Sequence, residues 1–153
     1  MGRHWRQFSR SCRARATRRN TRSLKCSDYG LPPRRERLFI VGVHNAEASI
    51  LDFSAYRRDV SLTEFMGMPF ERKHAYTIRC GGRRSGIHDR HNWDTYRVDG
   101  QAHTLTLSDC LKLQGFGEDF KLCGSVSQQW QQVGNTIPTR FTEMLAMNLR
   151  ALS

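Results

Sequence analysis

The feature that most constrains the fold is an uninterrupted run of four apolar residues, Leu38–Val41, which follows a charged stretch and ends at Gly42. Such a run is typical of a strand that is buried on both faces. A buried strand needs hydrogen-bonded neighbours, because an unpaired edge exposes backbone donors and acceptors. The chain offers few other strands of this kind, so we expect another polypeptide to cover this edge.

The chain is 153 residues long, which suits one domain with a core rather than two independent ones. Its formal net charge of +11 at pH 7 predicts a polyanionic partner, because neutralising phosphates releases condensed counterions. Residues 1–27 hold nine of the 25 lysines and arginines and no acidic residue. A segment this charged cannot offset its conformational entropy by burial, so we expect a disordered basic tail that orders, if at all, on DNA. A transit peptide and a segment without a selected role are the alternatives.

The sequence favours neither a membrane protein nor a disulfide or metal framework. No apolar run reaches the ~18 residues that span a bilayer, and no signal-peptide core is present. Secreted disulfide frameworks and zinc sites need close cysteine pairs, and Cys80, His88 and His91 make only a partial ligand set. We therefore expect free thiols, no metal and a cytoplasmic location. The cysteines are Cys12, Cys26, Cys80, Cys110 and Cys123.

Short strands and loops are expected in the middle of the chain, where residues 43–104 lack sustained periodicity. The Asp99-Gly100 dipeptide is a common hairpin turn and separates two short β-prone segments. Loops held on a small scaffold are where recognition residues tend to lie. The predicted strands are 75–80, 95–98 and 105–107.

Three short helices are expected in the last third of the chain. Thr106 and Asp109 match a capping box, and Gly115 ends the helix that it begins. A second helix is expected over 126–133, broken by Gly134 and Asn135, and a third follows Pro138. The third helix carries an apolar stripe of Phe141, Met144, Leu145 and Leu149.

Three sequence blocks resemble the C-terminal motifs of the DNA cytosine-5 methyltransferases. They are PPRRERLFIVG, LTLSDCLKLQGFGEDF and QQVGNTIP, which stand in the family's order. With the segments between them, the resemblance covers residues 28–153. The chain departs from the family pattern at Pro33, where the family usually has Gln, at His103, where it often has Arg, and at Gly117, where it has Pro.

The resemblance implies roles for two pairs of residues. Arg35 and Arg37 would lie near the flipped cytosine and its flanking phosphates, where guanidinium groups form bidentate hydrogen bonds. Read without the family, they are solvated or paired with Glu36. Asn135 and Thr136 would approach the methionine portion of S-adenosylmethionine at a helix N-terminus, or simply cap that helix.

Target recognition by this resemblance falls on residues 77–96, which combine basic residues with glycines. Arginine suits guanine edges, and glycines let the backbone approach a groove closely. The segment resembles those of methyltransferases that read GGCC-type sites. The residues predicted to contact duplex DNA are Arg79, Arg83, Arg84, Arg90, His91 and Asn92.

The family's catalytic strings do not occur in this sequence. The family uses a cysteine in a Pro-Cys-Gln loop, a glutamate in a Glu-Asn-Val block and a Gly-rich turn for the cofactor. No cysteine here follows a proline, so no catalytic residue is assigned. We expect this chain to be inactive alone and to bind S-adenosylmethionine only with a second polypeptide that carries those motifs.

The expected fold is therefore α+β: mostly a small target-recognition domain of irregular short strands and loops, plus one strand and a C-terminal helix that complete a partner's α/β catalytic domain. The function expected from the resemblance is that of a recognition part of a bacterial restriction-modification methyltransferase. A non-catalytic DNA-binding or regulatory module and an inactive truncated fragment are the alternatives. The predicted segments are a tail at 1–27, a catalytic-domain strand at 28–42, a recognition domain at 43–124 and a helical return at 125–153.

Overall fold

The computed structural model describes residues 17–44, 52–81, 84 and 86–150, and its mixture of helices and short strands confirms the expected α+β class. No helix in these ranges is long and apolar enough to cross a bilayer. In chain order the elements are β1 (Thr17–Lys25), η1 (Cys26–Asp28), β2 (Glu36–His44), η2 (Ser54–Tyr56), α2 (Leu62–Met66), β3 (Thr95–Val98), β4 (Gln101–Thr104), α3 (Leu107–Leu113), α4 (Val126–Asn135) and α5 (Thr139–Arg150).

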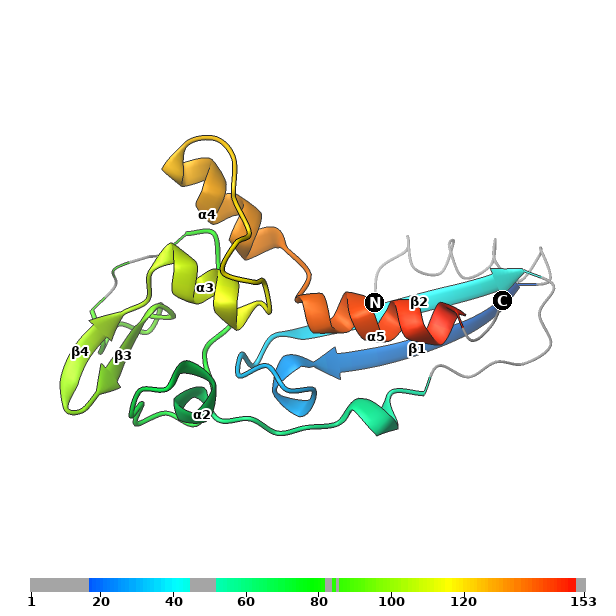
Figure 1. Cartoon of the computed structure of the whole chain (residues 1–153), viewed down its shortest axis with the longest axis horizontal. Coiled ribbons are helices and arrows are strands. Elements are labelled where there is room, and N and C mark those ends of the chain that lie inside the picture. The colour runs from blue at the N-terminus through cyan, green and yellow to red at the C-terminus, as the bar shows by residue number, and fades with distance from the viewer. Residues whose placement is uncertain (1–16, 45–51, 82–83, 85, 151–153) are drawn as a thin grey trace.

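The molecule is elongated and has two lobes, which Figure 1 shows side by side. The long-strand lobe consists of β1, β2 and α5. The hairpin lobe consists of α2, β3, β4, α3 and α4. Each lobe has its own cluster of buried apolar side chains, and Phe65 packs at the margin of both clusters.

The long-strand lobe is a two-stranded antiparallel sheet covered on one face by α5 (Figure 1). The register runs from Thr17 opposite His44 to Lys25 opposite Glu36. Successive side chains of a strand point to opposite faces, so Phe39 meets α5, with its ring 5.4 Å from that of Phe141. Its cluster of buried apolar residues is Leu24, Cys26, Tyr29, Leu31, Phe53, Phe141 and Met144.

The hairpin lobe encloses a fuller core. The rings of Trp93 and Trp130 meet edge to face at 6.1 Å, which joins the loop before β3 to α4. Asp99 and Gly100 connect β3 to β4 with φ values of 50° and 73°, as a tight two-residue hairpin turn requires. Its cluster of buried apolar residues is Leu62, Phe70, Ala75, Ile78, Trp93, Tyr96, Leu105, Cys110, Leu113, Trp130 and Val133.

The expectation of a disordered tail at 1–27 is wrong for Thr17–Lys25, which forms β1. Disorder was expected because the composition of this segment allows little burial, but its backbone forms a hydrogen-bonded ladder with β2. Residues 1–16 lie outside the described residues. The strand predicted within 28–42 is found at Glu36–His44, and in this chain by itself one face of it is open: Leu38 is 55% exposed and Ile40 is 37% exposed.

Two predicted short strands are wrong and one is confirmed. The strand at Thr95–Val98 is present, and its partner is Gln101–Thr104 rather than 105–107. A two-residue turn forces residue 101 to pair with residue 98, so the ladder ends before the capping Thr106. Residues 75–80 form no strand and make one isolated bridge, from Ala75 to Pro33.

The predicted helices are present with shifted ends. The capping box at Thr106 and Asp109 is confirmed and begins α3, and Gly115 follows that helix with a φ of 88°. Helix α4 continues through Gly134 and Asn135, which were expected to break it. The predicted segment 125–153 divides its contacts, because α4 packs in the hairpin lobe and α5 in the long-strand lobe.

Candidate functional site

Arg35 lies at the joint between the two lobes, one residue before β2. Its guanidinium donates hydrogen bonds to three backbone carbonyls: that of Ile78 at 3.2 Å, that of Gly134 at 3.1 Å and that of Thr136 at 2.9 Å. These carbonyls belong to the predicted recognition segment and to the QQVGNTIP block. One side chain therefore ties the PPRRERLFIVG block, to which Arg35 belongs, to the recognition segment and to the QQVGNTIP block.

The surroundings of Arg35 are unusual for a charged group. Only 3% of the residue is exposed, and its Nε has no hydrogen-bond partner among the described residues. Burial, and after it the positive charge of Arg37, lowers the pKa of Arg35. Arg37 is half-buried and donates to the Glu36 carbonyl at 2.7 Å. The predicted contacts of both arginines with a base or phosphate stay predictions.

Gly134 allows α4 to approach the recognition segment closely. A Cβ at this position would lie 2.6 Å from the backbone nitrogen of Cys80 and 2.8 Å from the carbonyl carbon of Arg79. Only a residue without a side chain fits there. The Cys80 thiol also donates to Asn135 Oδ1 at 3.2 Å, so the recognition segment and the predicted cofactor residue are in direct contact.

The residues around Asn135 suit the polar end of S-adenosylmethionine. A hollow of about 550 Å³ lies beside Asn135, and side-chain amides line it. Amides both donate and accept hydrogen bonds, as recognition of an amino acid's amine and carboxylate requires. The Thr136 carbonyl already accepts a hydrogen bond from Arg35. The lining residues are Cys123, Gly124, Gln128, Gln131, Gln132 and Asn135.

The predicted recognition segment is anchored from within. The Trp93 indole donates from Nε1 to the Gly81 carbonyl at 2.8 Å. Asp94 is 1% exposed, and its Oδ2 accepts from the backbone nitrogen of Arg84 at 2.7 Å. Arg84 has a φ of 58°, a value that non-glycine residues rarely adopt. Trp93 and Asp94 thus hold the base of a loop in which the side chains of Arg84 and Arg90 are exposed.

Most of the predicted DNA-contacting side chains are exposed. They are Arg79, Arg84, Arg90 and His91. Arg90 donates from Nε to His91 Nε2 at 3.0 Å, so these two lie together. Asn92 uses both ends of its amide on the Thr95 backbone, at 2.7 and 3.0 Å, and would have to release Thr95 to read a base. Arg83 lies outside the described residues.

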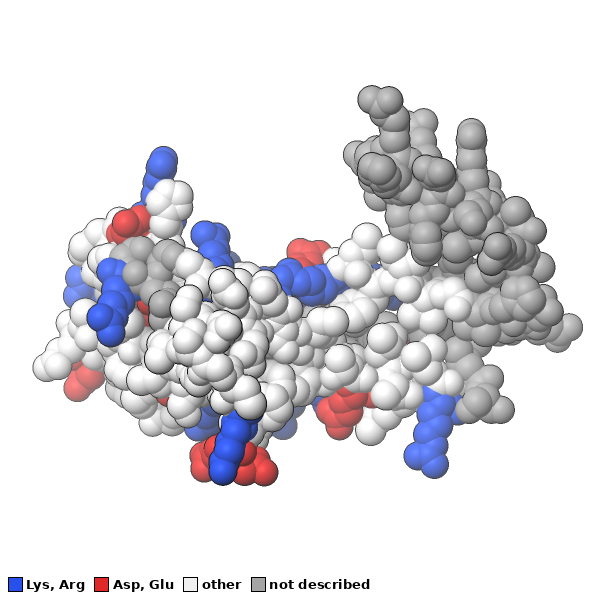
Figure 2. Space-filling view, turned by 90° about the horizontal axis from the view of Figure 1, so that it is seen from above, with Lys and Arg blue, Asp and Glu red and all other residues white. Residues whose placement is uncertain are grey.

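Figure 2 shows basic side chains spread over the hairpin lobe on one face of the molecule, with a few acidic ones between them. No group of three or more His, Cys, Asp or Glu side chains in the described part of the chain could hold a metal ion.

The LTLSDCLKLQGFGEDF block stabilises the joint between the lobes through Gln114. Gln114 is fully buried and donates from Nε2 to the Val133 carbonyl at 3.1 Å, and the backbone carbonyl of Gln114 accepts from the Thr139 backbone nitrogen at 3.0 Å.

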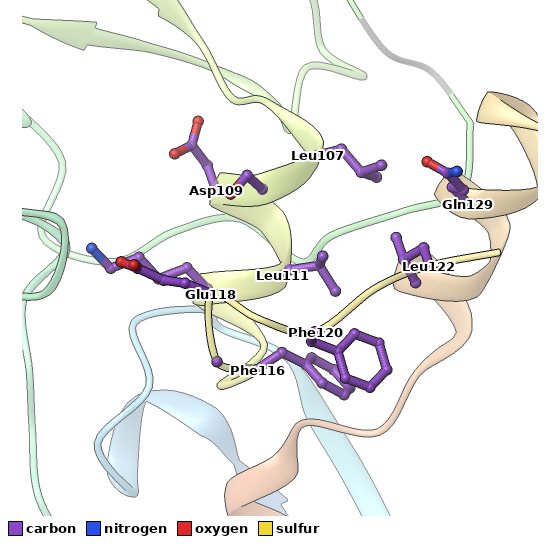
Figure 3. A pocket seen from close by; sticks show the side chains of 11 residues that line it. Leu107, Asp109, Leu111, Phe116, Glu118, Phe120, Leu122 and Gln129 are labelled. Carbon is purple, nitrogen blue, oxygen red and sulfur yellow. The ribbon is translucent and has the colours of Figure 1, made fainter.

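A separate pocket of about 510 Å³ lies between α3, the following loop and α4 (Figure 3). Leu111, Leu122, Phe116 and Phe120 supply its apolar side, and the two phenylalanine rings are 4.4 Å apart. The lining also includes charged residues: Asp109, Lys112 and Glu118. None of the residues predicted to bind DNA or cofactor lines it.

Two residues at the joint were missed by sequence reasoning. Cys80 was considered only as a free thiol or part of an incomplete metal-ligand set, although it contacts Asn135, and Gly134 was treated as a helix breaker although it permits a close approach. Neither position carries a local signal of these contacts, because both depend on residues about 55 positions away in the chain. Asp94 falls within the predicted recognition segment 77–96, yet the Asn-Trp-Asp-Thr order is typical of a side-chain-stabilised turn.

The sequence of this chain is similar to those of known DNA methyltransferases. A family model described as C-5 cytosine-specific DNA methylase matches residues 70–151, more than half of the chain. The Type II methyltransferase M.DsaV of Dactylococcopsis salina is 28% identical over 82% of this chain and 46% of its own length. M.AplI of Arthrospira platensis is 24% identical over 83% of this chain and 46% of its length. The chain thus spans about half the length of these curated relatives.

Solved structures share the fold. The S. pombe Dnmt2 methyltransferase superposes with a TM-score of 0.67 at 14% identity, over 99% of this chain and 63% of that one. The Entamoeba histolytica methyltransferase EhMeth gives a TM-score of 0.62 at 13% identity, over 96% of this chain and 57% of that one. The chain belongs to the C-5 cytosine-specific DNA methylase family.

Proposed function

We propose that this chain supplies the DNA-recognition segment and one wall of the cofactor pocket of a DNA (cytosine-5) methyltransferase. The whole enzyme would transfer a methyl group from S-adenosylmethionine to cytosine in duplex DNA, in a bacterial restriction-modification system. Family membership supports the reaction, and the Type II names of the relatives support the setting.

The observation that carries this proposal is the joint at Arg35. Its three hydrogen bonds hold the start of β2, the recognition segment and the QQVGNTIP block in fixed relation. A methyltransferase needs this relation, because the base extruded from DNA must meet the methyl group within reacting distance. Arg37 would then contact the flipped cytosine or its flanking phosphate, while the buried Arg35 positions the segments around it.

The exposed basic residues of the recognition segment would bind duplex DNA. Arg79, Arg84 and Arg90 offer guanidinium groups, which pair with guanine edges or with phosphates. His91 adds a further donor beside Arg90. Arg83 and Asn92 complete the proposed set, and a GGCC-type site is the proposed target. Asn135 and Thr136 would hold the cofactor, which supplies the methyl group when it is bound.

A second polypeptide would supply the catalytic cysteine and glutamate. The outer face of the long-strand lobe supports this part of the proposal, because Leu38 and Ile40 are apolar and exposed on a strand. Within the described residues β2 pairs only with β1, which leaves its other edge free. A partner strand at that edge would complete the ladder and cover the apolar face.

Reconstitution tests the proposal. The chain is mixed with a polypeptide that carries the Pro-Cys-Gln loop and the Glu-Asn-Val block, and transfer of labelled methyl groups to duplex DNA is measured. We expect transfer only from the mixture, and loss of transfer when R79A and R90A are combined. The matched control is K112A with K121A, which removes the same charge from exposed positions outside the recognition segment. Transfer by this chain alone would refute the division of labour.

The second candidate function is a free-standing DNA-binding or regulatory module. The closed core of the hairpin lobe favours it, because this lobe carries the recognition segment on a cluster of its own. Specific duplex binding by the chain alone, with the same affinity in the presence and absence of S-adenosylmethionine, would support the module over the enzyme part. An inactive fragment would show neither specific binding nor a cooperative unfolding transition.

A further inference from the structure

A basic pocket lies at the joint, apart from the proposed DNA and cofactor residues. It has a volume of about 400 Å³, and four basic side chains from three parts of the chain line it: Lys25, Arg34, Arg57 and Arg58. Arg34 is exposed in this pocket, whereas its neighbour Arg35 is buried against the carbonyls described above. The two adjacent arginines therefore serve different sites.

Backbone hydrogen bonds fix the frame of this pocket. The Arg58 nitrogen donates to the Asp28 carbonyl at 2.9 Å, and the Gly30 nitrogen donates to the Arg58 carbonyl at 2.7 Å. The Arg34 nitrogen donates to the Ala75 carbonyl at 2.9 Å. The segments that carry the basic side chains are thus held together before any ligand arrives. Such preorganisation lowers the entropic cost of binding.

The charges of the pocket do not balance. Asp59 is engaged by Lys73, whose Nζ lies 2.5 Å from its carboxylate, and Arg58 lies 3.5 Å from Glu64. Lys25, Arg34 and Arg57 form no ion pair with another described residue, and the remaining carboxylate in the lining is that of Asp28. Three cationic groups consequently face one carboxylate.

His74, which lines the same pocket, is affected by this positive field. Its side chain is 13% exposed. Burial lowers the pKa of His74; Asp59 opposes that effect, and the charges of Lys73, Arg34 and Lys25 add to the lowering. The imidazole is therefore mainly neutral at pH 7 and leaves the pocket's charge to the lysine and arginine side chains.

We propose that the pocket of Lys25, Arg34 and Arg57 binds a phosphate group. A phosphate offers several acceptor oxygens, which match the forked donors of two guanidinium groups and the ammonium of a lysine. The group comes either from the DNA backbone or from a free phosphate-bearing molecule. Both sources present the same chemistry to the pocket.

Titration of the full chain with inorganic phosphate at constant ionic strength tests the site. Amide resonances are followed by nitrogen-15 NMR. We expect saturable shifts at Lys25, Arg34 and Arg57, and a rise of about tenfold or more in the half-saturating phosphate concentration when R34Q and R57Q are combined, which corresponds to the loss of two charge-assisted hydrogen bonds.

A matched pair, K112Q with K121Q, removes the same charge elsewhere and should leave the titration unchanged. All four side chains are exposed, so neither pair disturbs a core. Shifts that do not saturate, or equal weakening by both pairs, would overturn the site and reduce the effect to net charge.

A duplex DNA arm identifies the source of the phosphate, and this arm alone depends on the proposed function. If a backbone phosphate occupies the pocket, R34Q with R57Q should flatten the slope of log affinity against log salt by about one phosphate contact or more, and inorganic phosphate should compete with DNA. An unchanged slope assigns the site to a free phosphate group. Loss of DNA binding in R79A with R90A tests the recognition segment separately, because the phosphate titration needs no DNA.

Discussion

The hairpin lobe and the long-strand lobe differ in how completely they bury their apolar residues. The hairpin lobe surrounds Trp93, Leu113 and Val133 from several sides, and each is at most 1% exposed. The long-strand lobe covers one face of its sheet with α5 and leaves Leu38 and Ile40 in solvent. The hairpin lobe therefore has a core that is enclosed on several sides. The long-strand lobe has a core on one face of its sheet and exposed apolar side chains on the other.

Two leucines measure this difference most directly. Leu113 is fully buried in the hairpin lobe, so Leu113→Ala should lower the free energy of unfolding by about 2–5 kcal/mol through lost burial and a cavity. Leu38→Ala removes an exposed side chain and should change it by less than about 0.5 kcal/mol. Urea denaturation measures both. A large loss in L38A would mean that another chain covers this face in solution, which sedimentation would reveal.

The joint between the lobes depends on Arg35. Arg35→Ala leaves two buried carbonyls and one partly buried carbonyl without their donor and should cost about 2–4 kcal/mol. Because these bonds connect the lobes, the single unfolding transition should separate into two, with the long-strand lobe unfolding first. Arg34→Ala, at an exposed neighbour, is the control and should keep one transition. One transition in R35A as well would show that apolar contacts, such as those of Phe65, suffice to couple the lobes.

A glycine tests the packing of the recognition segment on the hairpin lobe. Gly134→Ala gains helix propensity, but its Cβ meets the backbone of Cys80 at 2.6 Å, so a net loss of about 1–3 kcal/mol is expected. Gly81→Ala adds a Cβ with no atom within 4 Å and should be nearly neutral. Thermal unfolding compares the two. Equal stability of G134A and G81A would mean that residues 79–80 move away freely.

Local patterns predicted the hairpin lobe better than the long-strand lobe. The capping box at Thr106 and the Asp99-Gly100 turn act within a few residues, and both are confirmed. The strand at Thr17–Lys25 was missed because its stability comes from pairing with β2, not from its own composition. A charged segment that forms a ladder with a distant strand carries no periodic apolar signal.

The sequence predicted the residues of the candidate site but not the contacts between them. The sequence named Arg35, Asn135 and the recognition segment separately, each from its own motif. The structure adds that Arg35 holds carbonyls of the other two regions and that Cys80 contacts Asn135. These contacts join residues up to 101 positions apart, so no local pattern could reveal them. The basic pocket was hidden for the same reason, because three segments contribute to it.

Among the described residues each lobe contains one buried cysteine, which gives a separate probe of its opening. Burial raises the pKa of Cys26 in the long-strand lobe and of Cys110 in the hairpin lobe from 9.0 to about 12. At pH 8 both thiols should therefore resist alkylation, because the thiolate is the reactive form. The exposed Cys123 should react at once and serves as the internal control.

Under native conditions Cys26 should become labelled faster than Cys110, since the half-covered lobe opens at lower free energy. Mass spectrometry of the labelled peptides measures both rates. The stability should also fall as pH rises between about 9 and 12, because the unfolded thiols release protons that the folded ones keep. Faster labelling of Cys110 would reverse the assignment of the weaker lobe. Equal rates would mean that the two lobes unfold together. The hydrogen bonds of Arg35 would then couple the lobes strongly enough to outweigh the difference in how well each is packed.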